Sequence, residues 1–223
     1  MSSLSRVAEG IINRSPFLRE AMTENLINIS ALARKIKPEL DRYFDNDIKE
    51  GAIIMAIKRL SPGTYHRLNL KIEGIVKEIG DFLVRSNLTS YTYENSNTIS
   101  TKQAELITIL DEDKKKAFYT ISKGVSETSI VTNLHEKEII TTLFQGEKLK
   151  LMDEDLASIT VQLPTLNTEV YGVYYYLLKQ LAWEGLNIVD IISTANEFTV
   201  IFHQEDVDHA FHILMQIKNS KDS

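Results

Sequence analysis

The second half of the sequence repeats one order of predicted elements, and this repeat limits the folds that the chain can adopt. From residue 85 to 155 the residue pattern predicts a strand, a helix, two strands, a helix and a strand. From residue 156 to 223 it predicts a strand, a helix, two strands and a helix. A βαββαβ unit of about 70 residues is the ferredoxin-like arrangement, an antiparallel sheet with both helices on one face. We therefore expect an α+β protein with two such units in tandem.

The individual elements of the two units follow from β-rich runs and from apolar residues at helical spacing. In the unit over 85–155, the predicted strands are Leu88–Tyr93, Phe118–Ser122, Thr128–Thr132 and Leu149–Met152, and the predicted helices are Thr101–Leu110 and Glu136–Phe144. In the unit over 156–223, the predicted strands are Ala157–Pro164, Asn187–Ser193 and Glu197–Phe202, and the predicted helices are Gly172–Trp183 and Asp206–Ile217.

Residues 1–84 lack this alternation and predict a separate all-α domain. Its predicted helices are two short ones at Val7–Ile12 and Phe17–Met22, one at Ala31–Lys37 with Ser30 as N-cap, one at Ile48–Leu60, and a joining helix at Leu68–Leu83. Pro38 either ends the third helix or begins another.

Composition excludes several classes of protein. The chain has no cysteine, so disulfides, thiol catalysis and thiolate metal sites are excluded. It has no glycine-rich phosphate loop and no set of residues that proposes a reaction, so we expect neither an enzyme nor a cofactor. His209 and His212 have chelating spacing but lie off the apolar stripe of their helix, so we expect no metal site. No apolar run is long enough to span a membrane, and the N-terminus is charged, so the expected compartment is the cytoplasm.

The segment Asn167–Val200 resembles an ACT domain, particularly those of aspartokinases. The matching points are the loop leading to Gly172-Val173, the run Glu184-Gly-Leu-Asn-Ile before a strand, and Ser193-Thr-Ala-Asn-Glu-Phe-Thr-Val across a hairpin. Residues 85–155 share with this segment only the order of elements. The resemblance implies a regulatory module. Like ACT domains, it would bind small molecules, often amino acids, between two units and would pair as a homodimer. It does not extend to a kinase domain.

Carried over by position, the resemblance implies ligand contacts on a loop and on two strands. The candidates are Asn167, Tyr171, Gly172, Val173, Asn187, Ile188, Asp190, Asn196 and Glu197. Backbone N–H groups near Gly172 suit a ligand carboxylate, and Asp190 or Glu197 suits its ammonium. Purely structural roles remain open for Gly172 and Asn187 as turn residues and for Glu197 as a solvated charge. A bulky residue at Gly172 is expected to block the ligand and leave the fold largely intact.

The helical domain is the candidate output of such a sensor. Ile29–Ile36, a turn and Lys49–Arg59 resemble a helix-turn-helix or winged-helix core, in which the second helix enters the major groove of DNA. The candidate DNA contacts are Arg34, Lys35, Lys37, Lys49, Lys58 and Arg59. The connection is long for this motif, and residues 1–87 carry a net charge of only +3 against −9 for residues 88–223. A DNA-binding domain and a structural or protein-binding one both remain open.

Two functions follow from these expectations. The first is a cytoplasmic regulator whose tandem ACT-like units bind an amino acid or similar small effector and signal to the helical domain. The alternative is a dimerisation scaffold without a ligand, in which edge strands of the units pair between copies.

Overall fold

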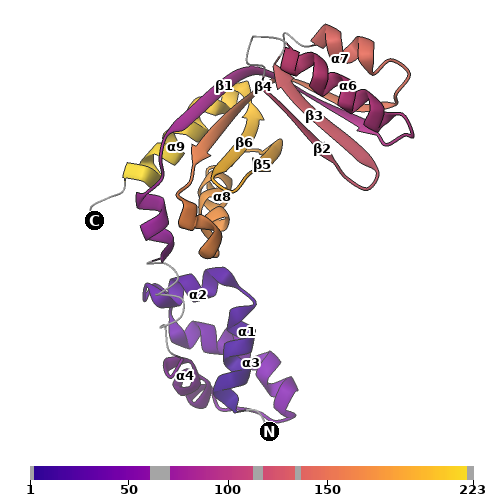
Figure 1. Ribbon diagram of the computed structural model, residues 1–223. Coiled ribbons are helices and arrows are strands. Elements are labelled where there is room, and N and C mark those ends of the chain that lie inside the picture. The colour runs from indigo at the N-terminus through magenta and orange to yellow at the C-terminus, as the bar shows by residue number, and fades with distance from the viewer. Residues whose placement is uncertain (1–2, 61–70, 113–117, 134–136, 220–223) are drawn as a thin grey trace. The chain divides into compact units, whose positions relative to one another are not determined.

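The computed structural model describes residues 3–60, 71–112, 118–133 and 137–219. These residues form two compact units, Met1–Gly74 and Ile75–Ser223. We call the first the helical unit and the second the sheet unit (Figure 1). Among the residues that the structure describes, no helix is long and apolar enough to cross a bilayer.

Residues 3–60 of the helical unit form four helices with one apolar core. They are α1 (Leu4–Asn13), α2 (Pro16–Thr23), α3 (Ile29–Phe44) and α4 (Glu50–Lys58). The core is formed by α1, α3 and α4, with fully buried residues such as Ile12, Leu40 and Ile53. Residues 3–60 contain no strand, so this part of the chain provides no β-hairpin wing of the kind a winged helix needs.

Helix α3 continues through Pro38, where the sequence predicted that one helix ends or another begins. Leu32 and Ile36 precede the proline and Leu40 follows it, and all three side chains are buried in the same core. Proline removes one backbone hydrogen bond from a helix interior, but an uninterrupted helix keeps Leu40 on the buried face. The burial of that side chain explains why the helix extends to Phe44.

The two ends of α3 are fixed by side-chain and backbone caps. Asn28 Oδ1 accepts a hydrogen bond from the backbone N–H of Ala31 at 3.1 Å, so Asn28 is the N-cap instead of the predicted Ser30. At the other end Asp45 adopts a left-handed conformation with φ of 49°, which ends the helix. The connection to α4 is therefore only residues 45–49, much shorter than the sequence suggested.

Asp41 organises this connection. Its Oδ1 accepts from the backbone N–H of Ile48 at 2.8 Å, and its Oδ2 accepts from Lys37 Nζ at 2.8 Å. Lys37 also contacts Asp47. The hydrogen bond from Lys37, followed by that from Ile48, lowers the pKa of Asp41, and the two carboxylates raise the pKa of Lys37.

The sheet unit is built on one six-stranded sheet with the strand order β2-β3-β1-β4-β6-β5. Its strands are β1 (Phe82–Glu94), β2 (Tyr119–Lys123), β3 (Glu127–Asn133), β4 (Leu149–Gln162), β5 (Asp190–Ser193) and β6 (Glu197–His203). Its helices are α6 (Ile99–Glu112), α7 (Lys137–Leu143), α8 (Val173–Trp183) and α9 (Val207–Asn219), with short 3-10 turns at Thr165–Glu169 and Gln204–Asp206. Every pairing in the sheet is antiparallel.

Two long central strands run through both halves of this sheet. The sequence predicted separate strands at Leu149–Met152 and Ala157–Pro164, but β4 is continuous from Leu149 to Gln162. Strand β1 begins at Phe82, where the sequence predicted a helix, and its first residues pair with the end of β4. The predicted boundary between residues 84 and 85 therefore falls inside β1. Only residues 71–77 of the predicted joining helix are helical in the described part of the chain.

The helix is interrupted before Phe82 because the backbone at Gly80 approaches β4 closely. The Gly80 N–H donates to the Gln162 carbonyl at 2.8 Å, and the Gln162 N–H donates to the Asp81 carbonyl at 3.1 Å. A Cβ atom on Gly80 would lie 2.9 Å from the Gln162 side chain. Glycine at this position lets strand pairing begin immediately after the helix.

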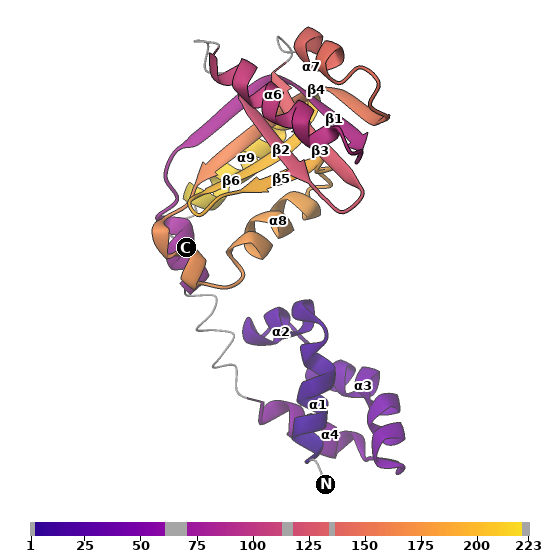
Figure 2. The ribbon, with the colours of Figure 1, turned by 45° about the vertical axis from the view of Figure 1, so that its right-hand side comes forward.

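The central strands bend where each carries an irregularity. Asn87 in β1 and Asp155 in β4 both have positive φ, at 57° and 54°, and the β1–β4 register shifts between Arg85 and Leu88. Such bulges bend a strand and increase its twist. In Figures 1 and 2, α6 and α7 lie over the half of the sheet that contains β2 and β3, and α8 and α9 lie over the half that contains β5 and β6.

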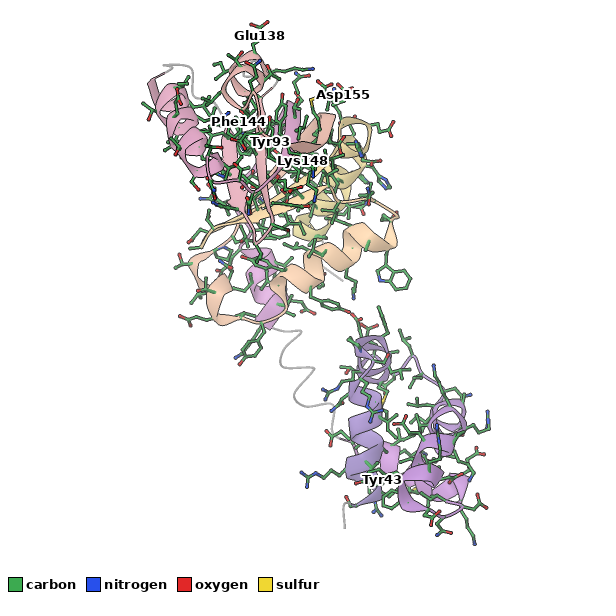
Figure 3. All side chains as sticks on the ribbon, turned by 90° about the vertical axis from the view of Figure 1, so that its right-hand side faces the viewer. Tyr43, Tyr93, Glu138, Phe144, Lys148 and Asp155 are labelled. Carbon is green, nitrogen blue, oxygen red and sulfur yellow. The ribbon has the colours of Figure 1, made fainter. Side chains whose placement is uncertain are left out.

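The two faces of the sheet carry different cores. Under α6 and α7, Tyr91 and Tyr93 are buried, and Tyr93 stacks on Phe144 at a centroid distance of 4.9 Å (Figure 3). Burial raises the pKa of Tyr93 to about 12. The opposite face, which we call the inner face, carries a smaller buried cluster that includes Leu88 and Ile201.

The stability of the sheet unit is expected to depend on the ionisation of Glu147. This carboxylate accepts hydrogen bonds from the Ser96 and Thr98 hydroxyls at 2.6 Å each, and its side chain is only 4% exposed. Both hydrogen bonds lower the pKa of Glu147, and the bond from Ser96 has the larger effect. A lowered folded-state pKa contributes stability above the unfolded-state pKa, and this contribution is lost as the pH falls through the folded-state value.

We expect Glu147→Gln to lower the free energy of unfolding by about 1–3 kcal/mol at neutral pH, because charge-assisted hydrogen bonds are lost. Urea denaturation of both proteins between pH 7 and pH 3 checks this, and the difference should shrink below pH 4.5. Glu138→Gln, at an exposed position on α7 (Figure 3), is the control. A constant difference across that range would contradict the assignment.

Candidate ligand-binding site

The loop before α8 is held to the β5–β6 hairpin by Asn167. Its side chain is buried, and its Nδ2 donates to the carbonyl oxygens of Pro164 at 2.9 Å and Ala195 at 2.8 Å. Both amide hydrogens are therefore used within the protein. Asn167 was predicted to contact a ligand, but in the structure its side chain fixes the shape of the loop.

Replacing Asn167 with alanine is expected to cost about 1–3 kcal/mol of stability, because a buried carbonyl loses its donor. Asn167→Asp should cost more, since a carboxylate cannot donate to either carbonyl. Thermal denaturation measures both, with Asn187→Ala at an exposed position as the control. Equal stability of Asn167→Ala and the unaltered protein would show that this loop is held by other contacts.

Gly172 begins α8 in a conformation that favours glycine. Its φ is 90° and its ψ is 0°, and its carbonyl accepts from the N–H of Tyr176 at 2.9 Å. Side chains are strained at such a φ, so a bulky residue at Gly172 is expected to lower the stability of the fold as well as to obstruct a ligand. Tyr171 before it is 81% exposed, whereas Val173 after it is buried in the core.

The remaining candidates lie at opposite ends of β5. Asn187 and Ile188 precede this strand, and Asp190 begins it, with its Oδ1 accepting from the N–H of Ile191 at 2.7 Å. Asn196 and Glu197 lie beyond its other end, in the turn and at the start of β6. The three strand residues after Asp190 separate the two groups, roughly 10 Å along the strand. The nine predicted residues therefore do not converge on one point.

Two of the predicted residues do come together. Asn196 Nδ2 donates to Thr165 Oγ1 at 3.3 Å, and the carbonyl of Asn196 accepts from the Leu163 N–H at 2.7 Å. Together with Asn167, these contacts join the loop before α8 to the hairpin. The loop and the hairpin therefore depend on each other for their shapes.

Glu197 faces a cavity that the sequence did not indicate. The cavity has a volume of about 410 Å³ and lies between β2 and the β5–β6 hairpin. Its lining residues are Ile107, Phe118, Tyr119, Thr120, Ile121, Ile192, Thr194, Glu197 and Thr199. Glu197 is the one charged side chain among them. Residues from β2 were missed because their proximity to β5 and β6 depends on the bend of the central strands, which no local pattern reveals.

The candidate DNA contacts of the helical unit divide into two groups. Arg34 forms an ion pair with Glu50 at 3.1 Å, and Lys37 is paired with Asp41 and Asp47. Four others are exposed: Lys35, Lys49, Lys58 and Arg59. The paired side chains hold α3, the turn and α4 together, which weakens the prediction that they bind phosphates.

No group of three or more potential metal ligands occurs among the described residues. The two histidines of α9 point to separate partners. His209 Nε2 lies 3.6 Å from Glu184 Oε2, and His212 Nε2 lies 2.8 Å from Gln216 Nε2.

No family model and no curated protein matches this sequence. Solved structures do match. The aspartate kinase of Clostridium acetobutylicum is 16% identical with a TM-score of 0.53, over 63% of this chain and 35% of that chain. The ligand-free regulatory subunit of aspartate kinase from Thermus thermophilus is 14% identical with a TM-score of 0.51, over 62% of this chain and 97% of that chain.

A third match is a structure of aspartokinase alpha and beta subunits, 13% identical with a TM-score of 0.50, over 63% of this chain and 99% of that chain. This chain therefore spans only about a third of the Clostridium enzyme but nearly all of the Thermus regulatory subunit. At such identities the likeness concerns the fold alone. This protein is an α+β protein with the ACT-like fold found in regulatory regions of aspartate kinases.

Proposed function

We propose that this protein is a regulatory protein without catalytic activity of its own, whose sheet unit binds an amino acid or a similar small effector. The observation that carries the proposal is the match to the Thermus thermophilus regulatory subunit over 97% of that chain. In Thermus thermophilus, a chain with this fold is the regulatory subunit of aspartate kinase. The proposal requires no cofactor, and no residues of the described chain suggest a reaction. The helical unit would then receive the signal.

A thermal-shift screen of the full chain against the twenty amino acids tests this proposal. A ligand that binds only the folded state adds about 2.7 kcal/mol of stability at 100 times its dissociation constant. We expect at least one amino acid to raise the melting temperature by several degrees. Calorimetry that finds no binding of any of the twenty at millimolar concentration would contradict the proposal.

The alternative is a dimerisation scaffold, and exposed groups of the sheet unit favour some form of self-association. Strands β2 and β5 end the sheet, so each is paired on one side only in the described structure. Tyr171, Tyr175 and Trp183, on or beside α8, are 81%, 41% and 70% exposed. Edge strands and exposed aromatic groups are typical of protein interfaces. Sedimentation as a monomer at tens of micromolar would exclude this alternative.

DNA binding by the helical unit has weaker support. The connection of residues 45–49 between α3 and α4 suits a helix-turn-helix better than the sequence suggested, but two of the six predicted contacts, Arg34 and Lys37, are already paired with carboxylates. A direct test is titration of duplex DNA at several salt concentrations, with Lys58→Ala and Arg59→Ala as variants. Affinity that falls with salt and with these substitutions would support a DNA partner.

A further inference from the structure

The cavity beside Glu197 combines apolar walls with a polar floor. Phe118, Ile121 and Ile192 give it apolar surface from both halves of the sheet. Thr199 and Thr194 add hydroxyl groups. A volume of about 410 Å³ is within the range of pockets that hold small molecules. The size and mixed lining therefore suit a small ligand with one apolar part.

Strand β2 contributes to this cavity. It is the last strand of the sheet, and four of its residues or neighbours, Phe118–Ile121, line the cavity. Strand β2 therefore forms one wall of the cavity, opposite the β5–β6 hairpin.

A chain of hydrogen bonds leads from Arg85 to the cavity. Arg85 Nη1 donates to Thr160 Oγ1 at 3.2 Å, and Thr160 Oγ1 lies 2.8 Å from Thr199 Oγ1. Either hydroxyl of this pair can be the donor, and when Thr160 donates to Thr199, the hydrogen of Thr199 is free to point into the cavity. Arg85 forms no ion pair with a carboxylate of the described residues, so its charge polarises this chain without a neutralising partner.

The inner face of the sheet buries several hydroxyl groups near Arg85. Thr160 and Thr199 are almost fully buried and are hydrogen-bonded to each other. Ser158 is the cross-strand partner of Arg85 on β4, it is fully buried, and its hydroxyl has no hydrogen-bond partner among the described residues. An unpaired buried hydroxyl lowers stability, so Ser158 is a polar position that packing of the sheet alone does not explain.

A carboxylate and a hydroxyl lie along one strand of this cavity. Glu197 and Thr199 are two residues apart on β6, so their side chains lie on the same face, roughly 7 Å apart along the strand. Glu197 offers a carboxylate, and Thr199 offers a hydrogen polarised by Arg85. A molecule with an ammonium and a carboxylate on one carbon is complementary to this pair.

We propose that this cavity binds an amino acid with an aliphatic side chain. The ammonium lies at Glu197, the carboxylate accepts from the Thr199 hydroxyl, and the side chain contacts Phe118 and Ile192. This inference rests on the proposed amino-acid function and names a site for it that differs from the loop before α8.

The experiment is calorimetric titration of the full chain with L-leucine, L-isoleucine and L-valine. The N-acetyl and amide derivatives of the tightest of the three test each charge separately, since one lacks the ammonium and the other the carboxylate. Glu197→Gln and Thr199→Val are each expected to weaken binding about tenfold or more, the loss typical of one charge-assisted hydrogen bond. Thr199→Val preserves the shape of the side chain and leaves Thr160 bonded to Arg85, while it removes the hydrogen bond between Thr160 and Thr199.

Two matched controls lie outside the cavity. Glu205→Gln removes an exposed charge just after β6, and Thr89→Val removes a buried hydroxyl from the face of β1 that carries Tyr91. Both are expected to leave binding unchanged. Circular dichroism of each variant confirms that it is folded.

The outcomes separate the site from the function. Weaker binding in Glu197→Gln and Thr199→Val but not in the controls supports the cavity. Unchanged binding in both variants, or binding only of an amino acid that is not aliphatic in the wider screen, overturns the cavity and leaves the proposed function in place. Failure of all twenty amino acids to bind overturns both.

Discussion

Replacing Phe198 with alanine is expected to lower the free energy of unfolding of the sheet unit by about 3–5 kcal/mol, the usual cost of removing a buried phenyl group. Phe198 is 1% exposed, and its ring stacks on that of Tyr174 with centroids 4.8 Å apart. It pairs with Val161 on one side and Ser193 on the other, so its loss leaves a void between β6 and α8. Urea denaturation followed by circular dichroism measures the change.

A conservative change at the partner ring separates packing from hydrogen bonding. Tyr174→Phe keeps the stacked ring and removes only the hydroxyl that lies 2.6 Å from Ser193 Oγ. We expect it to cost about 1 kcal/mol, because the hydroxyls are at the surface. If Phe198→Ala cost no more than Tyr174→Phe, the stack would not be part of the core, and the position of α8 over the sheet would need another explanation.

The identity and order of most elements could be predicted from sequence because they depend on local pattern. The last helix is an example: Val207, Ala210 and Leu214 recur at helical spacing, and α9 covers that segment. The hairpin between β2 and β3 was likewise predicted from two β-rich runs with a polar loop. In both cases the residues that decide the structure lie within a few positions of one another.

The continuity of the sheet could not be predicted in this way. Asp153, Glu154 and Asp155 interrupt the apolar alternation of β4, so the pattern indicates two strands with a loop between them. In the structure these residues belong to the strand, and Asp155 absorbs the bend in a left-handed conformation. A bulge of this kind depends on the neighbouring strand, which is distant in the sequence.

The candidate site illustrates the same limit. Glu197 was identified through the family resemblance, but the residues that lie around it come from β2, more than seventy positions earlier. Thr199 was missed because a threonine in a strand is an ordinary β-former, and only its contact with Thr160 and Arg85 makes it distinctive. Chemistry that depends on contacts between strands requires the register, which the sequence alone does not supply.

Leu40→Ala is expected to destabilise the helical unit by about 2–5 kcal/mol, because Leu40 is fully buried in the core of that unit. The result tests the continuity of α3, since Leu40 reaches the core only if the helix passes through Pro38 without a change of face. Hydrogen exchange measured by mass spectrometry should show lost protection in α1, α3 and α4. Tyr43→Ala, which removes a side chain that is 60% exposed (Figure 3), is the control and should cost much less.

Pro38→Ala is expected to raise the stability of the helical unit, whereas Leu40→Ala lowers it. The result decides whether α3 is continuous through Pro38 or whether a new helix begins there. Inside a helix, proline is about 3 kcal/mol less favourable than alanine, whereas at the first position of a helix it is well tolerated. Replacing Pro38 adds a backbone N–H in the middle of α3, and we expect it to stabilise the helical unit by about 1–3 kcal/mol after the greater freedom of the unfolded chain is subtracted. A loss of stability would mean that a new helix begins at Pro38. The burial of Leu40 would then have to arise from a bend between two helices, not from one continuous α3.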